Sequence, residues 1–222
     1  MPIRLDERLA RIASLVDYGK VADVGCDHGK LGYYLIGTDR ASKVIATDIS
    51  APSLQKASEL ARENGVSELM QTRLGDGLVP VESGEVDTVI IAGLGGDVIS
   101  GILEQARADG KSFEYFILSP NTHAEKVRQT IICMGHTILF DDLLTCAGKT
   151  YTVIKTKKGE ERLDENQIKY GKFYLTNKTF KRQLENEITK KRAILERTFS
   201  EELKKKVVEL EHLLSTLTCA TE

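Results

Sequence analysis

Short apolar segments recur between residues 20 and 120, and stretches with helical periodicity separate most of them. Several of these segments are nearly continuous runs of Val, Ile and Ala, which is typical of strands buried on both faces of a parallel sheet. Alternation of such strands with helices predicts an α/β fold with an open sheet. The predicted strands are 20–25, 43–48, 69–75, 86–93 and 114–120, and the predicted helices are 30–36, 51–64, 97–108 and 123–134.

The chain continues with two more strand-like segments, 136–144 and 150–158, which are separated by five residues that include Gly148. Two strands joined through a short glycine-containing loop form an antiparallel hairpin. The sequence therefore predicts a doubly wound sheet that ends in a β-hairpin, within a Rossmann-like domain that spans 1–158.

The composition is that of an ordinary globular protein. The chain has 222 residues, of which 41% are hydrophobic and 29% are charged, enough for one core and an appendage. No apolar run approaches the roughly 20 residues of a membrane span, and the charged N-terminus lacks the apolar core of a signal peptide. We therefore expect a cytoplasmic protein. The four cysteines form neither a CxxC pair nor a cluster with zinc spacing, so we expect no metal site.

After residue 158 the pattern changes to two amphipathic segments, 178–199 and 200–217. We expect an antiparallel helical hairpin with its turn near 197–200, within a second domain that spans 159–222. The second segment has apolar residues at alternating spacings of four and three, as in a coiled-coil seam. A seam this short favours pairing within one chain, and so a monomer over a dimer. Its residues are Leu203, Val207, Leu210, Leu214 and Leu217, and Phe180, Leu184, Ile188 and Leu195 form a rougher stripe on the first segment.

Charge is distributed unevenly along the chain. From Lys157 onward there are 15 Lys and Arg against 12 Asp and Glu, whereas the rest of the chain carries 16 against 21. A basic segment attached to an acidic body suggests a polyanion as its partner, although a solvated helical surface has the same composition.

In a doubly wound sheet, ligands bind beyond the carboxyl ends of the strands, so the residues that follow each strand are the informative ones. Asp48 ends the second strand, 23 residues after Gly25. A carboxylate at this place can accept from both hydroxyls of an adenosine ribose, in NAD enzymes and in S-adenosylmethionine enzymes alike. The alternative is a helix N-cap, because the sequence that follows can open a helix.

The turn after the first strand, in VADVGCDHGKLG (21–32), carries Asp27 where a dinucleotide-binding turn has a glycine. A carboxylate there would repel a diphosphate and attract a sulfonium. The turn therefore favours S-adenosylmethionine over NAD, with Asp27 facing the cofactor. His28 beside it is either a second functional residue of this turn or an incidental loop histidine.

Three further strand ends carry candidate residues. Asp76 can accept from an adenine amine and Gly77 can let the backbone approach the ring, although Asp-Gly also makes tight turns. The segment AGLGG (92–96) indicates close approach of a ligand, or else tight packing of the helix that follows. Asn121 offers a donor and an acceptor to a base edge, or simply ends its strand in a turn.

Taken together, ADVGCDHGKLGYYL, ATDIS, GDGL, IIAGLGG, LSPN and GKTYTVI, followed by a basic helical hairpin, resemble the bacterial tRNA (adenine-22-N1)-methyltransferase family over nearly the whole chain. The leading RLARIASLV fits the short helical start of that family. The resemblance implies a class I methyltransferase fold, S-adenosylmethionine as methyl donor and a coiled-coil-like C-terminal domain that helps to hold tRNA. By position it implies a cofactor site formed by Gly25, Asp48, Ile49, Asp76, Gly77 and Gly93.

The same resemblance places Asp27, His28 and Asn121 against the target adenine. Many members carry glutamine where this chain has Ser119, which is a departure in the loop that contacts the base. Transfer to N1 needs alignment more than a strong base, because N1 has an in-plane lone pair. We expect Asp27 to stabilise the charge that spreads onto the ring, Asn121 to orient the base, and the adenine to leave its helix first. Phosphate contacts are expected from Lys178, Lys181, Arg182, Lys190, Lys191 and Arg192.

The residues alone leave three other functions open. A class I methyltransferase acting on another RNA, a small molecule or a protein is disfavoured by the basic hairpin. An NAD-dependent oxidoreductase is disfavoured by Asp27 in the first turn. An RNA-binding protein without activity is disfavoured by the full set of cofactor-binding residues.

Overall fold

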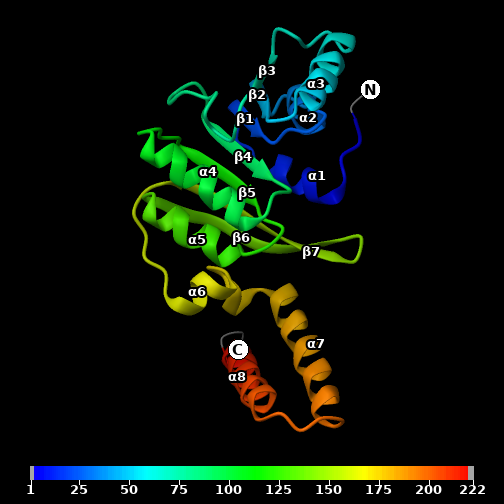
Figure 1. The fold of residues 1–222 in the computed structure, drawn as a ribbon, viewed down its shortest axis with the longest axis vertical. Helices are drawn as coiled ribbons and strands as arrows, with labels where there is room; N and C mark the ends of the chain where they lie inside the picture. The colour runs from blue at the N-terminus through cyan, green and yellow to red at the C-terminus, as the bar shows by residue number, and fades with distance from the viewer. Residues whose placement is uncertain (1–2, 220–222) are drawn as a thin grey trace.

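The computed structural model describes residues 3–219, with side chains through Leu217. Within these residues one mixed sheet has the strand order β3-β2-β1-β4-β5-β7-β6 (Figure 1). The strands are β1 (Gly19–Val24), β2 (Ala41–Asp48), β3 (Met70–Leu74), β4 (Thr88–Ala92), β5 (Tyr115–Ser119), β6 (His136–Cys146) and β7 (Lys149–Lys158). The first five are parallel, and β7 runs antiparallel to both of its neighbours. The predicted doubly wound sheet with a terminal hairpin is therefore confirmed.

Helices cover both faces of this sheet (Figure 1). On one face lie α1 (Glu7–Ser14), α2 (Lys30–Gly37) and α3 (Ala51–Glu63), and on the other lie α4 (Gly96–Ala108) and α5 (Ala124–Cys133). The four helices predicted between the strands are confirmed, with ends that differ by one residue at most. The helical start of the chain, which only the resemblance implied, is α1.

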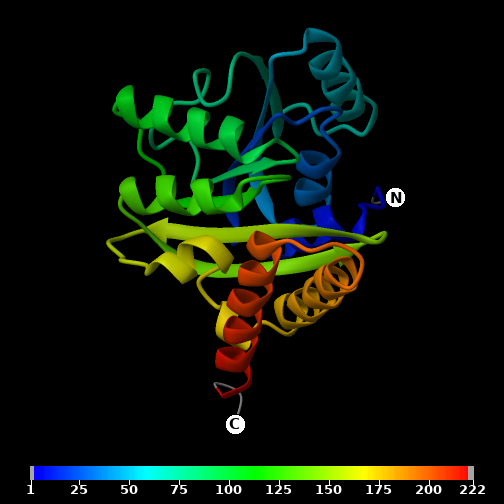
Figure 2. The same cartoon turned by 60° about the horizontal axis from the view of Figure 1, so that its bottom comes forward.

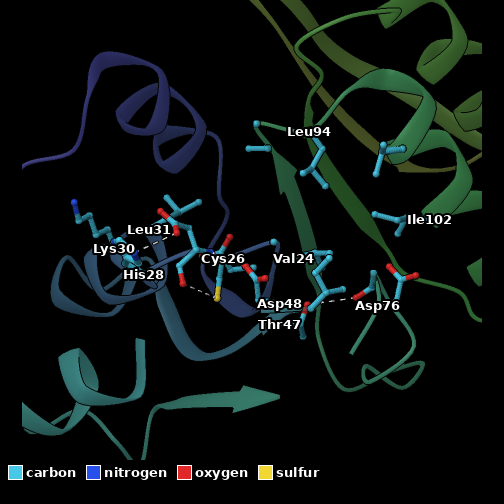
Figure 3. Close-up of a pocket in the computed structure, with 18 of the residues that line it drawn as sticks. Val24, Cys26, His28, Lys30, Leu31, Thr47, Asp48, Asp76, Leu94 and Ile102 are labelled. Carbon is cyan, nitrogen blue, oxygen red and sulfur yellow. Dashed lines mark hydrogen bonds and ion pairs between the residues drawn. The ribbon is translucent and has the colours of Figure 1, made fainter. Parts of the chain in front are cut away.

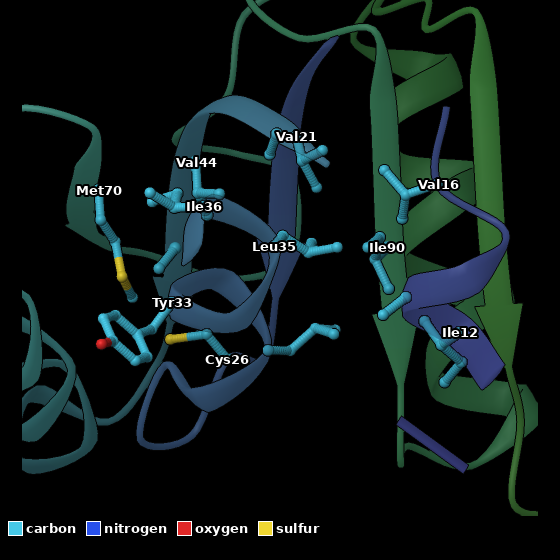
Figure 4. Close-up of a cluster of buried hydrophobic side chains, with 14 of the residues drawn as sticks. Ile12, Val16, Val21, Cys26, Tyr33, Leu35, Ile36, Val44, Met70 and Ile90 are labelled. Atoms are coloured by element: carbon cyan, nitrogen blue, oxygen red, sulfur yellow. The ribbon is translucent and has the colours of Figure 1, made fainter. Parts of the chain in front are cut away.

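The central strands are buried on both faces, as their continuous apolar sequences predict. Val21 of β1 and Ile90 of β4 have no exposed surface. Figure 4 shows Ile12 of α1 and Val16 just after it facing Ile90, and Leu35 of α2 beside them. α1 is therefore part of the core, which fixes its position beside the carboxyl end of β4.

The β-hairpin is longer than the sequence predicts. β6 continues to Cys146 and β7 begins at Lys149, so the connection is two residues rather than five. Ala147 and Gly148 have φ values of 49° and 76°. Positive φ at both positions is what a type I′ turn requires, and the twist of that turn matches the twist of the strands. The end of the hairpin consequently extends past the carboxyl end of β5 (Figure 1).

The C-terminal segment lies against the hairpin edge of the sheet (Figure 2). It comprises α6 (Glu165–Tyr170), the 3-10 helix η1 (Tyr174–Thr176), α7 (Lys178–Leu195) and α8 (Glu201–Cys219). α7 and α8 form the predicted helical hairpin. Ser200 caps α8, because its Oγ accepts from the backbone N–H of Leu203 at 3.2 Å.

The predicted seam between these helices is only partly right. Leu213, which the seam pattern leaves out, is buried, whereas Leu203 and Leu214 are half-buried. The reason is that α8 packs against η1 as well as α7, with Tyr174 in the same cluster, and so needs a wider apolar face than a two-helix seam. Of the other predicted residues, Phe180 and Leu195 are half-buried, and Leu184, Ile188, Val207, Leu210 and Leu217 are buried.

Candidate cofactor and substrate site

A cleft of about 520 Å³ opens at the carboxyl ends of β1, β2 and β4 (Figure 3). The strand order reverses here, because the chain runs outward from β1 to β3 and then crosses back to β4. Crevices at such reversals are where doubly wound sheets bind ligands. The cleft is lined by His28 and by all the residues predicted for the cofactor, namely Gly25, Asp27, Asp48, Ile49, Asp76, Gly77 and Gly93.

Hydrogen bonds hold the Asp48 carboxylate in place at the end of β2. The backbone N–H of Asp27 donates to its Oδ2 at 3.0 Å, and the backbone N–H of Ser50 donates to its Oδ1 at 2.8 Å. Each oxygen keeps a lone pair for a ligand in the cleft. Ser50, and not Asp48, is the N-cap of α3, because its hydroxyl accepts from the N–H of Ser53. The N-cap alternative for Asp48 is therefore wrong.

Gly25 and Gly93 leave bare backbone at two neighbouring strand ends. Their φ values are 70° and 83°, in the left-handed region where other residues are strained. A side chain at either position would also reduce the space of the cleft that both residues line. The two glycines therefore allow a ligand to lie directly on the ends of β1 and β4.

Asp23 is a site residue that the sequence analysis missed. It lies within β1 and lines the cleft, but only 5% of its surface is exposed. Its Oδ2 has no hydrogen-bond partner among the described residues. Burial, which disfavours the charged form, raises the pKa of this carboxyl from 3.8 to about 7. A buried carboxylate oxygen without a partner suits a cationic group of a ligand, such as an ammonium. In the sequence, the feature that could have indicated Asp23 is an acidic residue inside an otherwise apolar predicted strand.

The end of the cleft that lies away from His28 combines a carboxylate with apolar side chains (Figure 3). Asp76 lies there beside Val98 and Ile102, and Ile49 projects with 73% of its surface exposed. A Cβ added to Gly77 would lie 2.8 Å from Ile102, so this glycine permits close packing of its loop on α4. An apolar wall with one acceptor is suited to a purine ring with an exocyclic amine. Figure 3 shows His28 at one end of the cleft and Ile102 at the other.

Asn121 does not line the cleft itself but contacts its rim. Its Nδ2 donates to the carbonyl of Gly93 at 2.6 Å, and its backbone N–H donates to the carbonyl of Leu94 at 2.8 Å. The side-chain oxygen stays available as an acceptor. Gly96 explains the rest of the glycine segment, because a Cβ there would lie 2.4 Å from the carbonyl oxygens of Thr122 and His123. Gly93 thus leaves space in the cleft, whereas Gly96 allows the start of α4 to pack closely against the loop that contains Thr122 and His123.

His28 is held by its neighbours. Its Nε2 lies 3.4 Å from Oδ1 of Asp27 and 3.1 Å from Nζ of Lys56. An ammonium is only a donor, so this nitrogen accepts from Lys56. Asp27 itself has φ of 50°, a conformation that aspartate tolerates better than most residues, and its side chain is 75% exposed. Asp27 therefore has a carboxylate free to face a ligand, and His28 is held beside it by Lys56.

The six basic residues predicted to bind RNA all lie on α7 but form two groups. Lys178, Lys181 and Arg182 are near the end of the helix that meets β6, and no ion pair involves them among the described side chains. The second group is about nine residues further on, or ~13 Å along the axis. This second group is partly neutralised by ion pairs within the helical hairpin, because Lys191 lies 3.4 Å from Glu187 and Arg192 donates to Glu211. The second group is Lys190, Lys191 and Arg192.

The described residues contain neither a metal-binding cluster nor a membrane-spanning helix. No cluster of three or more His, Cys, Asp or Glu side chains is placed to hold a metal ion. None of the helices in that part of the chain is both long enough and apolar enough to span a bilayer.

Comparisons with known proteins agree with this geometry. The methyltransferase domain family matches residues 5–154. A tRNA (adenine(22)-N(1))-methyltransferase of Bacillus subtilis is 32% identical over 159 residues, which are 71% of this chain and 67% of that protein. The chain belongs to the tRNA (adenine-22-N1)-methyltransferase family. The predicted family is therefore confirmed.

Two solved structures of similar proteins extend the likeness to the whole fold. A Streptococcus pneumoniae protein, described as a putative tRNA (m1A22) methyltransferase in complex with S-adenosyl-L-methionine, is 26% identical. That match covers 99% of this chain and 100% of that chain, with a TM-score of 0.82. The M. capricolum TrmK structure in complex with S-adenosyl-homocysteine is 25% identical, covers 96% of this chain and 99% of that chain, and has a TM-score of 0.82. The likeness therefore includes the C-terminal helices.

Proposed function

We propose that this enzyme transfers a methyl group from S-adenosylmethionine to N1 of adenine 22 in tRNA. The family to which the chain belongs supports this reaction, and relatives are known with S-adenosylmethionine and S-adenosyl-homocysteine bound. The observation that carries the proposal is the set of carboxylates along the cleft: Asp23, Asp27, Asp48 and Asp76. Such a cleft attracts a cationic cofactor and repels a diphosphate, which speaks against the oxidoreductase alternative.

The cleft residues fit the parts of this cofactor. When bound, S-adenosylmethionine supplies an electrophilic methyl group on a sulfonium. Asp48, held by two backbone N–H groups, would accept from the ribose hydroxyls, and Asp76 would accept from the adenine amine. Asp23 would accept from the ammonium of the amino-acid portion, which gives its buried oxygen a partner. Gly25 and Gly93 would let the cofactor lie on the strand ends.

The target base would enter beside Gly93 and Asn121. The oxygen of the Asn121 amide is an acceptor for the adenine amine, which lies next to N1 on the pairing edge. Because that edge is normally paired or stacked, the base must be extruded before it reacts. N1 carries its own lone pair, so these residues need only align it and exclude water. The exposed carboxylate of Asp27 would stabilise the positive charge that the ring acquires, with His28 held beside it by Lys56.

The C-terminal domain, 159–222, would hold the tRNA. Lys178, Lys181 and Arg182 are exposed or half-buried cations without ion pairs among the described side chains, which suits them to phosphates. The apolar residues of α8 pack against α7 and η1 of the same chain, which supports a monomer. A tRNA substrate also supports action in the cytoplasm, as the sequence predicts.

A methyl-transfer assay tests the function directly. Purified enzyme and labelled S-adenosylmethionine are incubated with unmodified tRNA that has adenine at position 22, and with the same tRNA that has guanine there. We expect transfer to the first tRNA only. In Asp27→Ala and Asn121→Ala, kcat/KM should fall by about 100-fold, the scale of losing one transition-state contact. Transfer to both tRNAs would contradict the target base, and transfer to neither would favour a small-molecule or protein substrate.

A further inference from the structure

Arg8 is a cleft residue whose guanidinium has no hydrogen-bond partner among the described residues. It lies half-buried in α1, and its two terminal nitrogens lie 3.5 and 3.6 Å from the position of a Cβ added to Gly93. No acceptor in the described part of the chain bonds to its guanidinium, which contacts the ring of Tyr151 with Cζ 5.1 Å from the centroid. A guanidinium offers five donors in a planar fork that matches carboxylates and phosphates. Arg8 is therefore placed and oriented to bind an oxoanion at the cleft.

Two groups of the reaction partners have that chemistry: the carboxylate of the cofactor and a phosphate of the tRNA backbone. The surroundings of Arg8 favour the phosphate. Arg8 covers Gly93, whose carbonyl accepts from Asn121, and so it lies on the side where the base would enter.

The contact with Tyr151 connects Arg8 to the basic helix. Tyr151 lies on β7 close to the end of the hairpin, and the hydroxyl of the preceding residue, Thr150, accepts from Gln183 of α7 at 2.7 Å. Gln183 follows Lys181 and Arg182 on the same helix. The end of the β-hairpin thus contacts the basic helix through Thr150 and the cleft residue Arg8 through Tyr151.

We propose that Arg8, kept in orientation by Tyr151, binds the backbone phosphate of the target nucleotide and so positions the extruded adenine over Gly93 and Asn121. This inference rests on the proposed function, because it requires a nucleic-acid substrate. The planar fork can hold two oxygens of one phosphate, and the aromatic ring limits the guanidinium to one plane. Lysine would keep the charge but lose both constraints.

The test compares Arg8→Ala and Arg8→Lys with Arg11→Ala as the matched control. Arg11 lies one turn further along α1 and stacks on Phe140 of the same hairpin, with Cζ 4.7 Å from the centroid, but it does not line the cleft. The measurements are kcat/KM for adenine-22 tRNA, the salt dependence of tRNA binding, and the affinity for S-adenosyl-homocysteine. For Arg8→Ala we expect kcat/KM to fall about 100-fold and the salt slope to fall by about one phosphate contact. Arg8→Lys should recover the slope but little of kcat/KM, and cofactor affinity should change less than twofold.

Two results would overturn the inference. A tenfold or greater loss of S-adenosyl-homocysteine affinity with an unchanged salt slope would assign Arg8 to the cofactor carboxylate. Equal behaviour of Arg8→Ala and Arg11→Ala would reduce Arg8 to a packing residue of α1. If Arg8→Ala unfolds, Tyr151→Ala serves instead, with about a tenfold loss expected and Tyr151→Phe close to wild type. Failure of the wild-type enzyme to methylate adenine-22 tRNA would overturn the proposed function itself, and the same assay series shows it separately.

Discussion

The sheet domain and the C-terminal helices are stabilised in different ways. The sheet has two large apolar clusters, one on each face, in which residues such as Val89 and Ile117 have no exposed surface. The helices bury one small cluster between themselves and η1. Hydrophobic stabilisation scales with the apolar area removed from water, so the helices gain far less of it. They depend correspondingly on how they are attached to the sheet.

One part of that attachment is a buried ion pair. Nε of Arg128 in α5 donates to Oδ2 of Asp141 in β6 at 2.7 Å, and its NH2 group donates to Oδ1 at 3.0 Å. The same two side chains bind the C-terminal segment, because Arg128 also donates to the carbonyl of Ile168 and Asp141 accepts from the backbone N–H of Lys172. A buried ion pair with its remaining groups satisfied fixes a geometry more than it adds stability. The attachment therefore sets the direction in which α7 presents its cations.

Removing one partner of this ion pair should have the largest effect. Arg128→Met leaves the carboxylate of Asp141 buried without its charge partner, which costs about 3–5 kcal/mol of unfolding free energy. Urea unfolding measures this loss. Lys206→Met, which breaks the exposed pair with Glu209, is the control and should cost less than about 1 kcal/mol. Equal losses in the two variants would refute the special role of the buried pair. The double variant Arg128→Met/Asp141→Leu should regain most of the stability.

Deleting core volume should separate the two regions. Leu184→Ala and Ile90→Ala each remove a buried aliphatic side chain, at a cost of about 2–4 kcal/mol. In Leu184→Ala we expect loss of amide-exchange protection confined to α7 and α8, with S-adenosyl-homocysteine binding retained. In Ile90→Ala we expect weaker protection throughout the sheet and weaker binding. Loss of protection throughout the sheet in Leu184→Ala would show that the two regions unfold together.

The cleft gives a smaller, pH-dependent effect through Asp23. The pKa of Asp23 is about 7 in the folded protein, above the ordinary 3.8. Between these two pH values the folded, ligand-free protein keeps a proton on Asp23 that the unfolded chain has lost, so the free energy of unfolding falls as pH rises from 3.8 to about 7. An ammonium ligand favours the ionised form, so S-adenosyl-homocysteine affinity should rise from pH 5.5 to 7.5, by at most tenfold per unit. Calorimetric titration at several pH values measures this rise. In Asp23→Asn the slope should disappear, and a slope that persists would assign the ammonium elsewhere.

The sequence predicts what depends on local pattern. The strands follow from continuous apolar runs, and Gly25, Asp48 and Asp76 follow from their places at strand ends. What it misses depends on contacts between distant segments. Arg8 is unremarkable until α1 packs beside Gly93, and Leu213 is buried only because η1 adds a second partner for α8. The two-residue turn between β6 and β7 requires Ala147 to adopt a positive φ. The pairing register of the two strands imposes this conformation, and the residue types in the loop do not reveal it.

The smallest expected effect is a difference in tRNA binding between variants of two cations in α7. Lys181 has no ion pair among the described side chains, whereas Arg192 is already bonded to Glu211. A cation that must leave a carboxylate to meet a phosphate gains less from doing so. Lys181→Ala should therefore lower the salt slope of tRNA binding by up to about one counterion, with a several-fold loss of affinity at low salt. Arg192→Ala should change both by less, as a filter-binding series from 50 to 200 mM salt would measure. A larger effect in Arg192→Ala would place the tRNA along the far end of the helices, away from the hairpin that leads to Arg8.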